Sequence, residues 1–183
     1  HCMPHDLVIR AGTVADGTGE PARTADVAID DGIVVEVGRV GRGTREIDAY
    51  GALVTPGFVD IHTHYDAQLF WDPLLTISPW HGVTTVVVGN CGFGIAPASP
   101  PHRDLILRTL ERVEGMSLAA LQAGIGAQWP FETFAEYLDA IERLPPAVNV
   151  AVLLGHTPLR LHVMGERGAQ RSTSVGPSVS ATS

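Results

Sequence analysis

The chain has 183 residues, of which 45% are hydrophobic and 17% charged, so it can bury a core and is not globally disordered. Its formal net charge of -8 argues against a nucleic-acid-binding surface, which would need clustered basic side chains. The sequence contains no lysine, which excludes Schiff-base chemistry and a carboxylated-lysine metal bridge within this chain.

Two cysteines, Cys2 and Cys91, are too few for a disulfide framework, so a reducing, cytoplasmic compartment is expected. The N-terminal stretch shows no signal-peptide pattern, and no run approaches the roughly 20 apolar residues of a membrane span. We therefore expect neither a nucleic-acid partner nor a membrane partner.

The first part of the chain, residues 1–54, is rich in short β patterns. Valine and isoleucine runs occur in residues 6–14 and 25–38, and Asp31-Gly32 is typical of a two-residue hairpin turn. We expect a small β module without catalytic residues.

From Thr55 the pattern changes to three longer apolar, β-branched runs. They occupy residues 57–64, 82–92 and 147–157, and each ends in polar residues or glycine. Such runs are typical of parallel strands that are buried on both faces.

Two helical patterns lie between the second and third runs. Residues 103–115 place Leu107, Leu110 and Val113 on one side and end at Gly115. Residues 132–146 begin with Thr133 and Glu136 in capping-box relation and end at two prolines. The apolar stripe of this helix is formed by Phe134, Tyr137, Leu138 and Ile141.

Strands that alternate with helices indicate the α/β class, either a barrel or a doubly wound sheet. About three barrel-type strands are present, whereas a closed (β/α)8 barrel needs eight strands and roughly 250 residues. We expect residues 55–167 to be the beginning of a barrel, and the serine- and threonine-rich residues 168–183 to form a disordered or aberrant tail.

Two histidines, His62 and His64, end the first barrel-type run. On a strand they point the same way, about 6.6 Å apart, and share that face with Asp60. Neutral imidazoles at this spacing could bind one metal ion, or could be ordinary polar residues at a strand end. The apolar strand and the position at its carboxyl end favour a metal site.

Other polar residues follow the strands. Cys91 is a candidate thiolate ligand or a small buried residue. Asp60 could orient a ligand histidine or accept backbone hydrogen bonds, and His156 could face substrate, support a ligand or be an ordinary loop residue. Asp66 and Asp72 are expected to form turns.

These motifs resemble the amidohydrolase superfamily, specifically its D-aminoacylase (N-acyl-D-amino-acid deacylase) group. The resemblance rests on "TPGFVDIHTHYDAQLFWDP", "SPWHGVTTVVVGNCGFGIAP", "FAEYLDAIE" and "VAVLLGHTPLRLHVMGER", and covers residues 6–167. The first motif is common to the whole superfamily, and the Gly-Asn-Cys-Gly stretch selects the deacylase group.

The resemblance implies a TIM-type barrel preceded by part of a β-sandwich, and a Zn²⁺ site with His62, His64 and Cys91 as ligands. The implied reaction is hydrolysis of a small N-acyl-D-amino acid to a carboxylate and a free D-amino acid. The catalytic aspartate and the further histidine ligands are expected beyond the end of this sequence, so we expect an N-terminal fragment that is inactive alone.

Two alternatives remain open. A cyclic-amide hydrolase of the dihydropyrimidinase type would use a carboxylated lysine, for which this chain offers no residue. A non-catalytic fragment or binding module would have no turnover at all.

Overall fold

The computed structural model describes residues 3–126 and 129–169, so the predicted tail lies outside the described residues from position 170 onward. The chain divides into two compact units, His1–Gly57 and Phe58–Ser183.

The first unit is a β sheet with the strand order β3-β2-β1-β4, in which β5 also pairs with β1. Its strands are β1 (His5–Val14), β2 (Arg23–Asp30), β3 (Ile33–Gly38), β4 (Gly43–Asp48) and β5 (Leu53–Val54). The predicted hairpin is confirmed: β2 and β3 are antiparallel, and Asp31 and Gly32 join them with φ angles of 50° and 76°.

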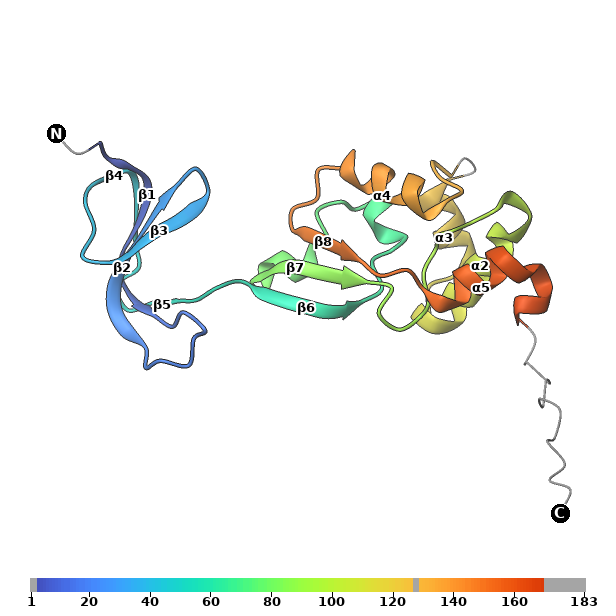
Figure 1. Cartoon of the computed structure of the whole chain (residues 1–183), viewed down its shortest axis with the longest axis horizontal. Helices are drawn as coiled ribbons and strands as arrows, with labels where there is room; N and C mark the ends of the chain where they lie inside the picture. The colour runs from blue at the N-terminus through green and yellow to red at the C-terminus, as the bar shows by residue number, and fades with distance from the viewer. Residues whose placement is uncertain (1–2, 127–128, 170–183) are drawn as a thin grey trace, which may run out of the picture. The chain divides into compact units, whose positions relative to one another are not determined.

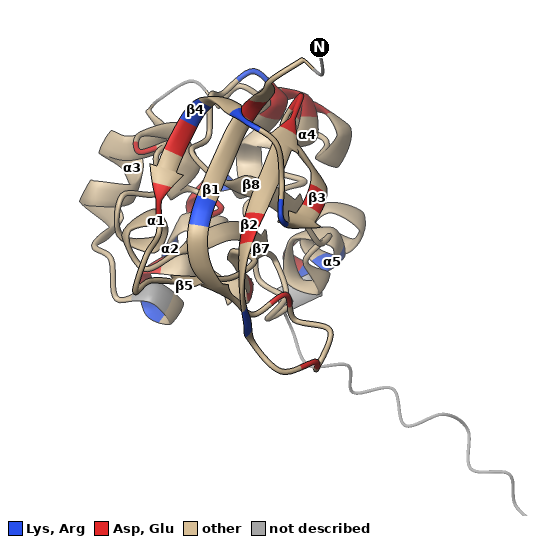
Figure 2. Ribbon diagram, turned by 90° about the vertical axis from the view of Figure 1, so that its left-hand side faces the viewer, with Lys and Arg blue, Asp and Glu red and all other residues tan. Residues whose placement is uncertain are grey.

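A bulge in β1 is held by charged side chains. Ala11 has a φ of 55°, and its amide donates a 2.8 Å hydrogen bond to the Asp26 carboxylate on β2. Arg10 donates to the same carboxylate at 3.0 Å and also pairs with Glu46 on β4. Charges of opposite sign therefore meet on β1, β2 and β4 (Figure 2).

The second unit contains a parallel sheet in the order β6-β7-β8 (Figure 1). Its elements are β6 (Phe58–Thr63), η1 (Gln68–Phe70), α1 (Ile77–Trp80), β7 (Val83–Val88), η2 (Pro100–His102), α2 (Arg103–Glu114), α3 (Leu118–Ile125), α4 (Phe134–Glu142), β8 (Asn149–Val152), α5 (His156–Met164) and η3 (Gly165–Ala169). The carboxyl ends of the strands therefore lie at one edge of the sheet.

Both predicted helices are present. α2 ends at Gly115, which has a φ of 67°, and α4 begins with the predicted capping box of Thr133 and Glu136. The predicted apolar stripes are wrong at one position each: Val113 is 39% exposed and Leu138 is 36% exposed.

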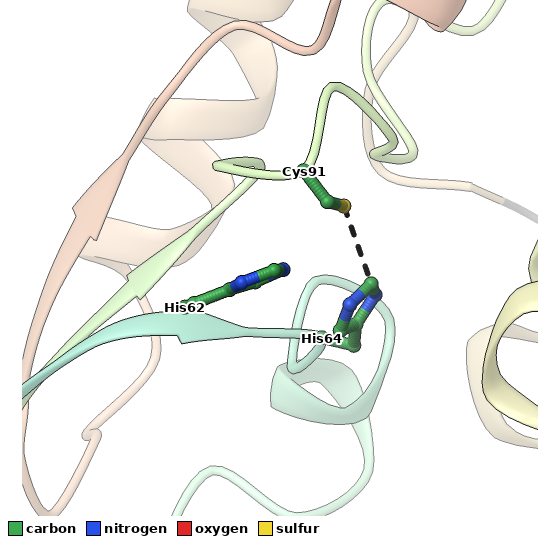
Figure 3. A group of neighbouring side chains, drawn as sticks. All are labelled: His62, His64 and Cys91. Carbon is green, nitrogen blue, oxygen red and sulfur yellow. Dashed lines mark hydrogen bonds between the residues drawn. The ribbon is translucent and has the colours of Figure 1, made fainter.

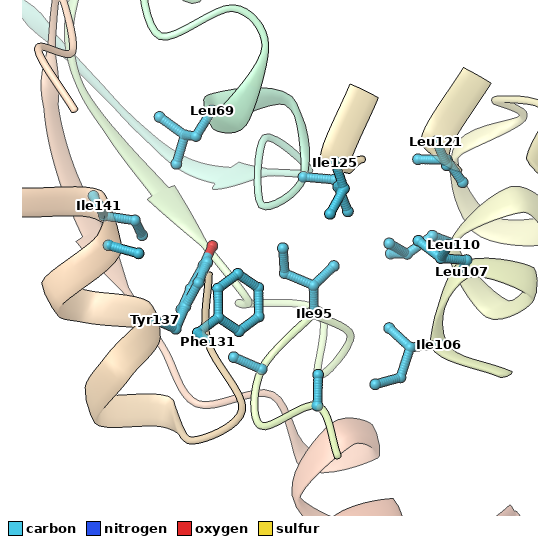
Figure 4. Packing of buried hydrophobic residues seen from close by; sticks show 14 of the residues in the cluster. Leu69, Ile95, Ile106, Leu107, Leu110, Leu121, Ile125, Phe131, Tyr137 and Ile141 are labelled. Atoms are coloured by element: carbon cyan, nitrogen blue, oxygen red, sulfur yellow. The ribbon is translucent and has the colours of Figure 1, made fainter. Parts of the chain in front are cut away.

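The core of the second unit lies where the helices pack together and against β7 (Figure 4). Its largest fully buried side chains include Tyr137, Leu69, Ile95, Leu110 and Leu121. The expectation that all three strands are buried on both faces is not met in the described ranges. The side chains of Phe58 and Ile61 on β6, and of Leu153 just after β8, remain exposed. β6 and β8 are also the two edge strands of this sheet, so each pairs with one neighbour only.

The described sheet is an α/β arrangement of three parallel strands, and no closed barrel is formed by the residues at 3–126 and 129–169. Within those ranges the structure also has no helix with the length and apolar character needed to cross a membrane.

Candidate metal centre

The carboxyl edge of the parallel sheet gathers the three predicted ligand side chains. His62 lies on β6, His64 follows its last residue, and Cys91 lies in the turn after β7. The side chains of all three residues point toward one another (Figure 3).

The three side chains are close enough to share an ion. Their candidate ligand atoms all lie within 4.8 Å of one another, and the Cys91 Sγ is 4.0 Å from the His64 Nδ1. The two imidazole rings have centroids 5.4 Å apart and are tilted by 36°. The contact between Cys91 and His64 joins residues 27 positions apart in sequence.

The donor set fits a borderline-soft divalent metal such as zinc, which prefers imidazole nitrogen and thiolate sulfur. In a tetrahedral zinc site, ligand atoms bonded at 2.0–2.3 Å are roughly 3.4–3.6 Å from one another. The 4.0 Å separation of the Cys91 sulfur and the His64 nitrogen is slightly wider than this spacing.

The protonation of His64 suits a ligand. Burial lowers its pKa from the ordinary value of 6.5, and the neighbouring His62 lowers the pKa further through charge repulsion. The imidazole is therefore neutral at pH 7 and keeps a nitrogen lone pair for a metal.

Asp60 accepts a hydrogen bond from the backbone beside the candidate ligands. Its Oδ1 accepts a 3.2 Å hydrogen bond from the backbone amide of His62. This contact corresponds to the alternative in which Asp60 binds backbone donors.

His156 lies at the same edge of the sheet but outside the three-residue group. It was expected at the end of a strand; instead β8 ends at Val152, and His156 is the first residue of α5. The side chain is exposed, and its Cβ lies next to Gly92 in the turn that holds Cys91.

Glycine is required at the start of the Cys91 turn. Gly89 has a φ of 81°, and a Cβ there would collide with the carbonyl oxygen of Leu153 after β8. The backbone of this turn can therefore approach the neighbouring strand only without a side chain.

Asp66 was expected to form a turn. It does lie in a turn, but it is only 4% exposed, and burial raises the pKa of its carboxyl to about 7. Its backbone carbonyl accepts a 3.2 Å hydrogen bond from the Tyr137 hydroxyl of α4. The apolar residues that follow, Ala67 and Leu69, were the one sequence signal of this burial.

Comparison with known proteins identifies the family of this chain. The profile of the amidohydrolase family matches residues 45–178, so the chain belongs to the amidohydrolase family. The resemblance drawn from the sequence motifs is thereby confirmed.

Within this family the chain is similar to N-acyl-D-amino acid deacylases. It is 40% identical over 169 residues to N-acyl-D-glutamate deacylase and 36% identical over 164 residues to D-aminoacylase, both from Alcaligenes xylosoxydans xylosoxydans. The alignments cover 91% and 88% of this chain but 32% and 31% of the relatives, so the chain spans about a third of their length.

A solved structure is similar over the same region. N-acyl-D-glutamate deacylase from Bordetella bronchiseptica, in complex with zinc and a phosphonate inhibitor that mimics the tetrahedral intermediate, is 37% identical. It superposes with a TM-score of 0.71 over 89% of this chain and 32% of that structure.

Proposed function

We propose that His62, His64 and Cys91 contribute to the metal centre of a zinc-dependent amidohydrolase that releases D-amino acids from small N-acyl-D-amino acids. The observation that carries this proposal is the convergence of one thiol and two imidazoles at the carboxyl edge of a parallel sheet. The similar deacylases support the choice of substrate.

The chain's own residues would hold the metal and set its environment. Zinc bound there would polarise the amide carbonyl and lower the pKa of a bound water toward about 7. Burial keeps His64 neutral, and Cys91 would bind as a thiolate, which reduces the net charge of the centre. We propose His156, exposed beside the Cys91 turn, as a residue that faces substrate.

We also propose that β6, β7 and β8 are neighbouring strands of a (β/α)8 barrel. Their parallel pairing in sequence order supports this topology. The first unit would then be part of a β-sandwich.

A cyclic-amide hydrolase is the less favoured function. That class would use a carboxylated lysine as a metal ligand, whereas the cluster here contains the Cys91 thiol. We therefore favour a linear N-acyl substrate.

The proposal is tested by zinc binding to the full chain, measured by competition with a chromophoric chelator. A Cys2→Ser background removes the second thiol. Cys91→Ala and His62→Ala should weaken binding by more than the roughly 10–100-fold that loss of a supporting hydrogen bond costs. His81→Ala, which removes an exposed histidine outside the cluster, is the matched control.

Equal affinity of Cys91→Ala and His81→Ala would overturn the metal centre. A second assay follows release of free amino acid from N-acetyl-D-glutamate and N-acetyl-L-glutamate. Zinc-dependent release by the 183-residue chain would contradict the expectation that it is inactive alone, and preference for the L-form would overturn the substrate assignment.

A further inference from the structure

The pairing of β6 with β7 is irregular just where the ligands begin. Asp60 pairs with Val86, but the next pair is Thr63 with Val88, so β6 has one residue more than β7 between these pairs. Such a bulge removes backbone groups from the ladder and changes the direction of the side chains beside it. His62 lies within this bulge.

Two side chains bridge the strands at the bulge. The Asn90 side-chain amide donates a 2.7 Å hydrogen bond to the carbonyl oxygen of Ile61. The Thr63 hydroxyl donates a 2.9 Å hydrogen bond to the carbonyl oxygen of Val87. The two bonds replace part of the backbone pairing that the bulge interrupts.

The Asn90 bond links the two parts of the ligand cluster directly. Ile61 immediately precedes His62, and Asn90 immediately precedes Cys91. A displacement of the Cys91 turn away from β6 would therefore have to break this hydrogen bond. The length of one asparagine side chain sets the separation of the two segments.

We propose that Asn90 is a positioning residue of the metal centre, with Thr63 as a second support. Asn90 holds the bulged end of β6 and the turn after β7 at the separation at which two imidazoles and a thiol converge. The inference rests on the proposed metal-binding function.

The exposure of Asn90 distinguishes this role from packing. Its side chain is exposed and fills no part of the core, so its removal should leave the unit folded. The loss should appear instead as a wider ligand cluster, and hence as weaker metal binding.

The chain offers a matched control in Asn149. Its side-chain amide also donates across neighbouring strands, from β8 to the Thr85 hydroxyl of β7 at 3.4 Å, and it is also exposed. This bond lies at the amino end of β8, away from the ligands. Asn149→Ala therefore removes a hydrogen bond of the same kind from the same sheet.

In the Cys2→Ser background, Asn90→Ala should weaken zinc binding by about 10–100-fold, and Asn149→Ala should leave it unchanged. With Co²⁺ as a second probe, the thiolate-to-cobalt absorption band should weaken only in Asn90→Ala. The urea midpoints of the two variants should agree. Thr63→Val, which removes the other bridge, should weaken zinc binding in the same direction.

Unchanged zinc affinity in both Asn90→Ala and Thr63→Val would overturn the positioning role while leaving the metal centre intact. Equal losses in Asn90→Ala and Asn149→Ala would overturn it as well, because the effect would then be general to the sheet. Absence of zinc binding in the Cys2→Ser parent would overturn the metal centre and this inference with it.

Discussion

The Tyr137 hydroxyl joins helix α4 to the turn that follows the two histidines. Tyr137 is 1% exposed, and its hydroxyl donates to the backbone carbonyl of Asp66 at 3.2 Å. Tyr137→Phe keeps the ring but leaves that buried carbonyl without this donor. We expect a loss of about 1 kcal/mol in the free energy of unfolding, measured by urea denaturation.

Tyr65→Phe is the comparison, because its hydroxyl bonds to the Ser78 hydroxyl in a half-buried position. Tyr65→Phe also leaves a buried group without this partner, because Ser78 is only 7% exposed, so a loss of about 1 kcal/mol is expected there too. An unchanged free energy of unfolding in Tyr137→Phe would contradict the importance assigned to the α4 contact.

Local sequence carried most of the information about the candidate ligands. His62 and His64 stand at the end of an apolar run, and Cys91 at the end of another, so parallel pairing alone brings them to one edge. The burial of Asp66 was not predictable in this way, because Tyr137 lies 71 positions away.

The N-terminus of helix α4 is fixed by its capping box. The Thr133 hydroxyl accepts from the Glu136 amide, and the Glu136 carboxylate accepts from the Thr133 amide. Thr133→Ala should cost about 1 kcal/mol of unfolding free energy, measured by urea denaturation.

Thr109→Ala is the matched control for this cap. Its hydroxyl bonds to the Leu105 carbonyl within α2, where such bonds do not support the helix. We expect little change or a slight gain in stability. Equal losses of unfolding free energy in the two variants would show that the capping box does not stabilise the protein specifically.

The first unit should be sensitive to acid. The hydrogen bond from Arg10 lowers the pKa of Glu46 from 4.5 to about 2, and a bond from the Ala11 amide lowers the pKa of Asp26. The folded state therefore holds these protons less tightly than the unfolded state. The resulting stability is complete above pH 4.5 and is lost as the pH falls toward 2.

Hydrogen exchange of the β1, β2 and β4 peptides between pH 5 and 2.5 would measure this loss. Glu46→Gln should make the stability of these strands less dependent on pH. An unchanged pH dependence in Glu46→Gln would contradict the role of the Arg10 pair.

Helix ends and turns were predictable because their determinants are local. Gly115, the Thr133 cap and the Asp31-Gly32 turn each act through neighbours within a few residues. The start of α5 at His156 was not predicted, since residues 147–157 follow a strand pattern and the N-cap residue Gly155 has no side chain to make a capping hydrogen bond. Burial of individual helix faces was also missed where it depends on which helix packs opposite.

Each unit buries apolar side chains of its own. Leu121 is fully buried in the second unit, and Val27 is 5% exposed in the first. Leu121→Ala should cost about 2–5 kcal/mol through cavity formation, seen as faster hydrogen exchange in residues 58–169. Val27→Ala should accelerate exchange in residues 3–57 instead.

A uniform acceleration across both units in either variant would show that they unfold as one.

The number of strands and the parallel order of β6, β7 and β8 followed from the sequence, because apolar runs alternate with helical patterns. Closure of a barrel depends on pairings between distant strands, which local patterns do not specify.

The division into two units also determines what an optical measurement can detect. All three tryptophans, Trp71, Trp80 and Trp129, belong to the second unit, and Trp129 packs edge-on against Phe131 beneath the Arg103 guanidinium. Intrinsic tryptophan emission will therefore report the helical unit and give no signal from the first sheet. Acid unfolding of that sheet should be visible by far-ultraviolet circular dichroism at a pH where the fluorescence is still native.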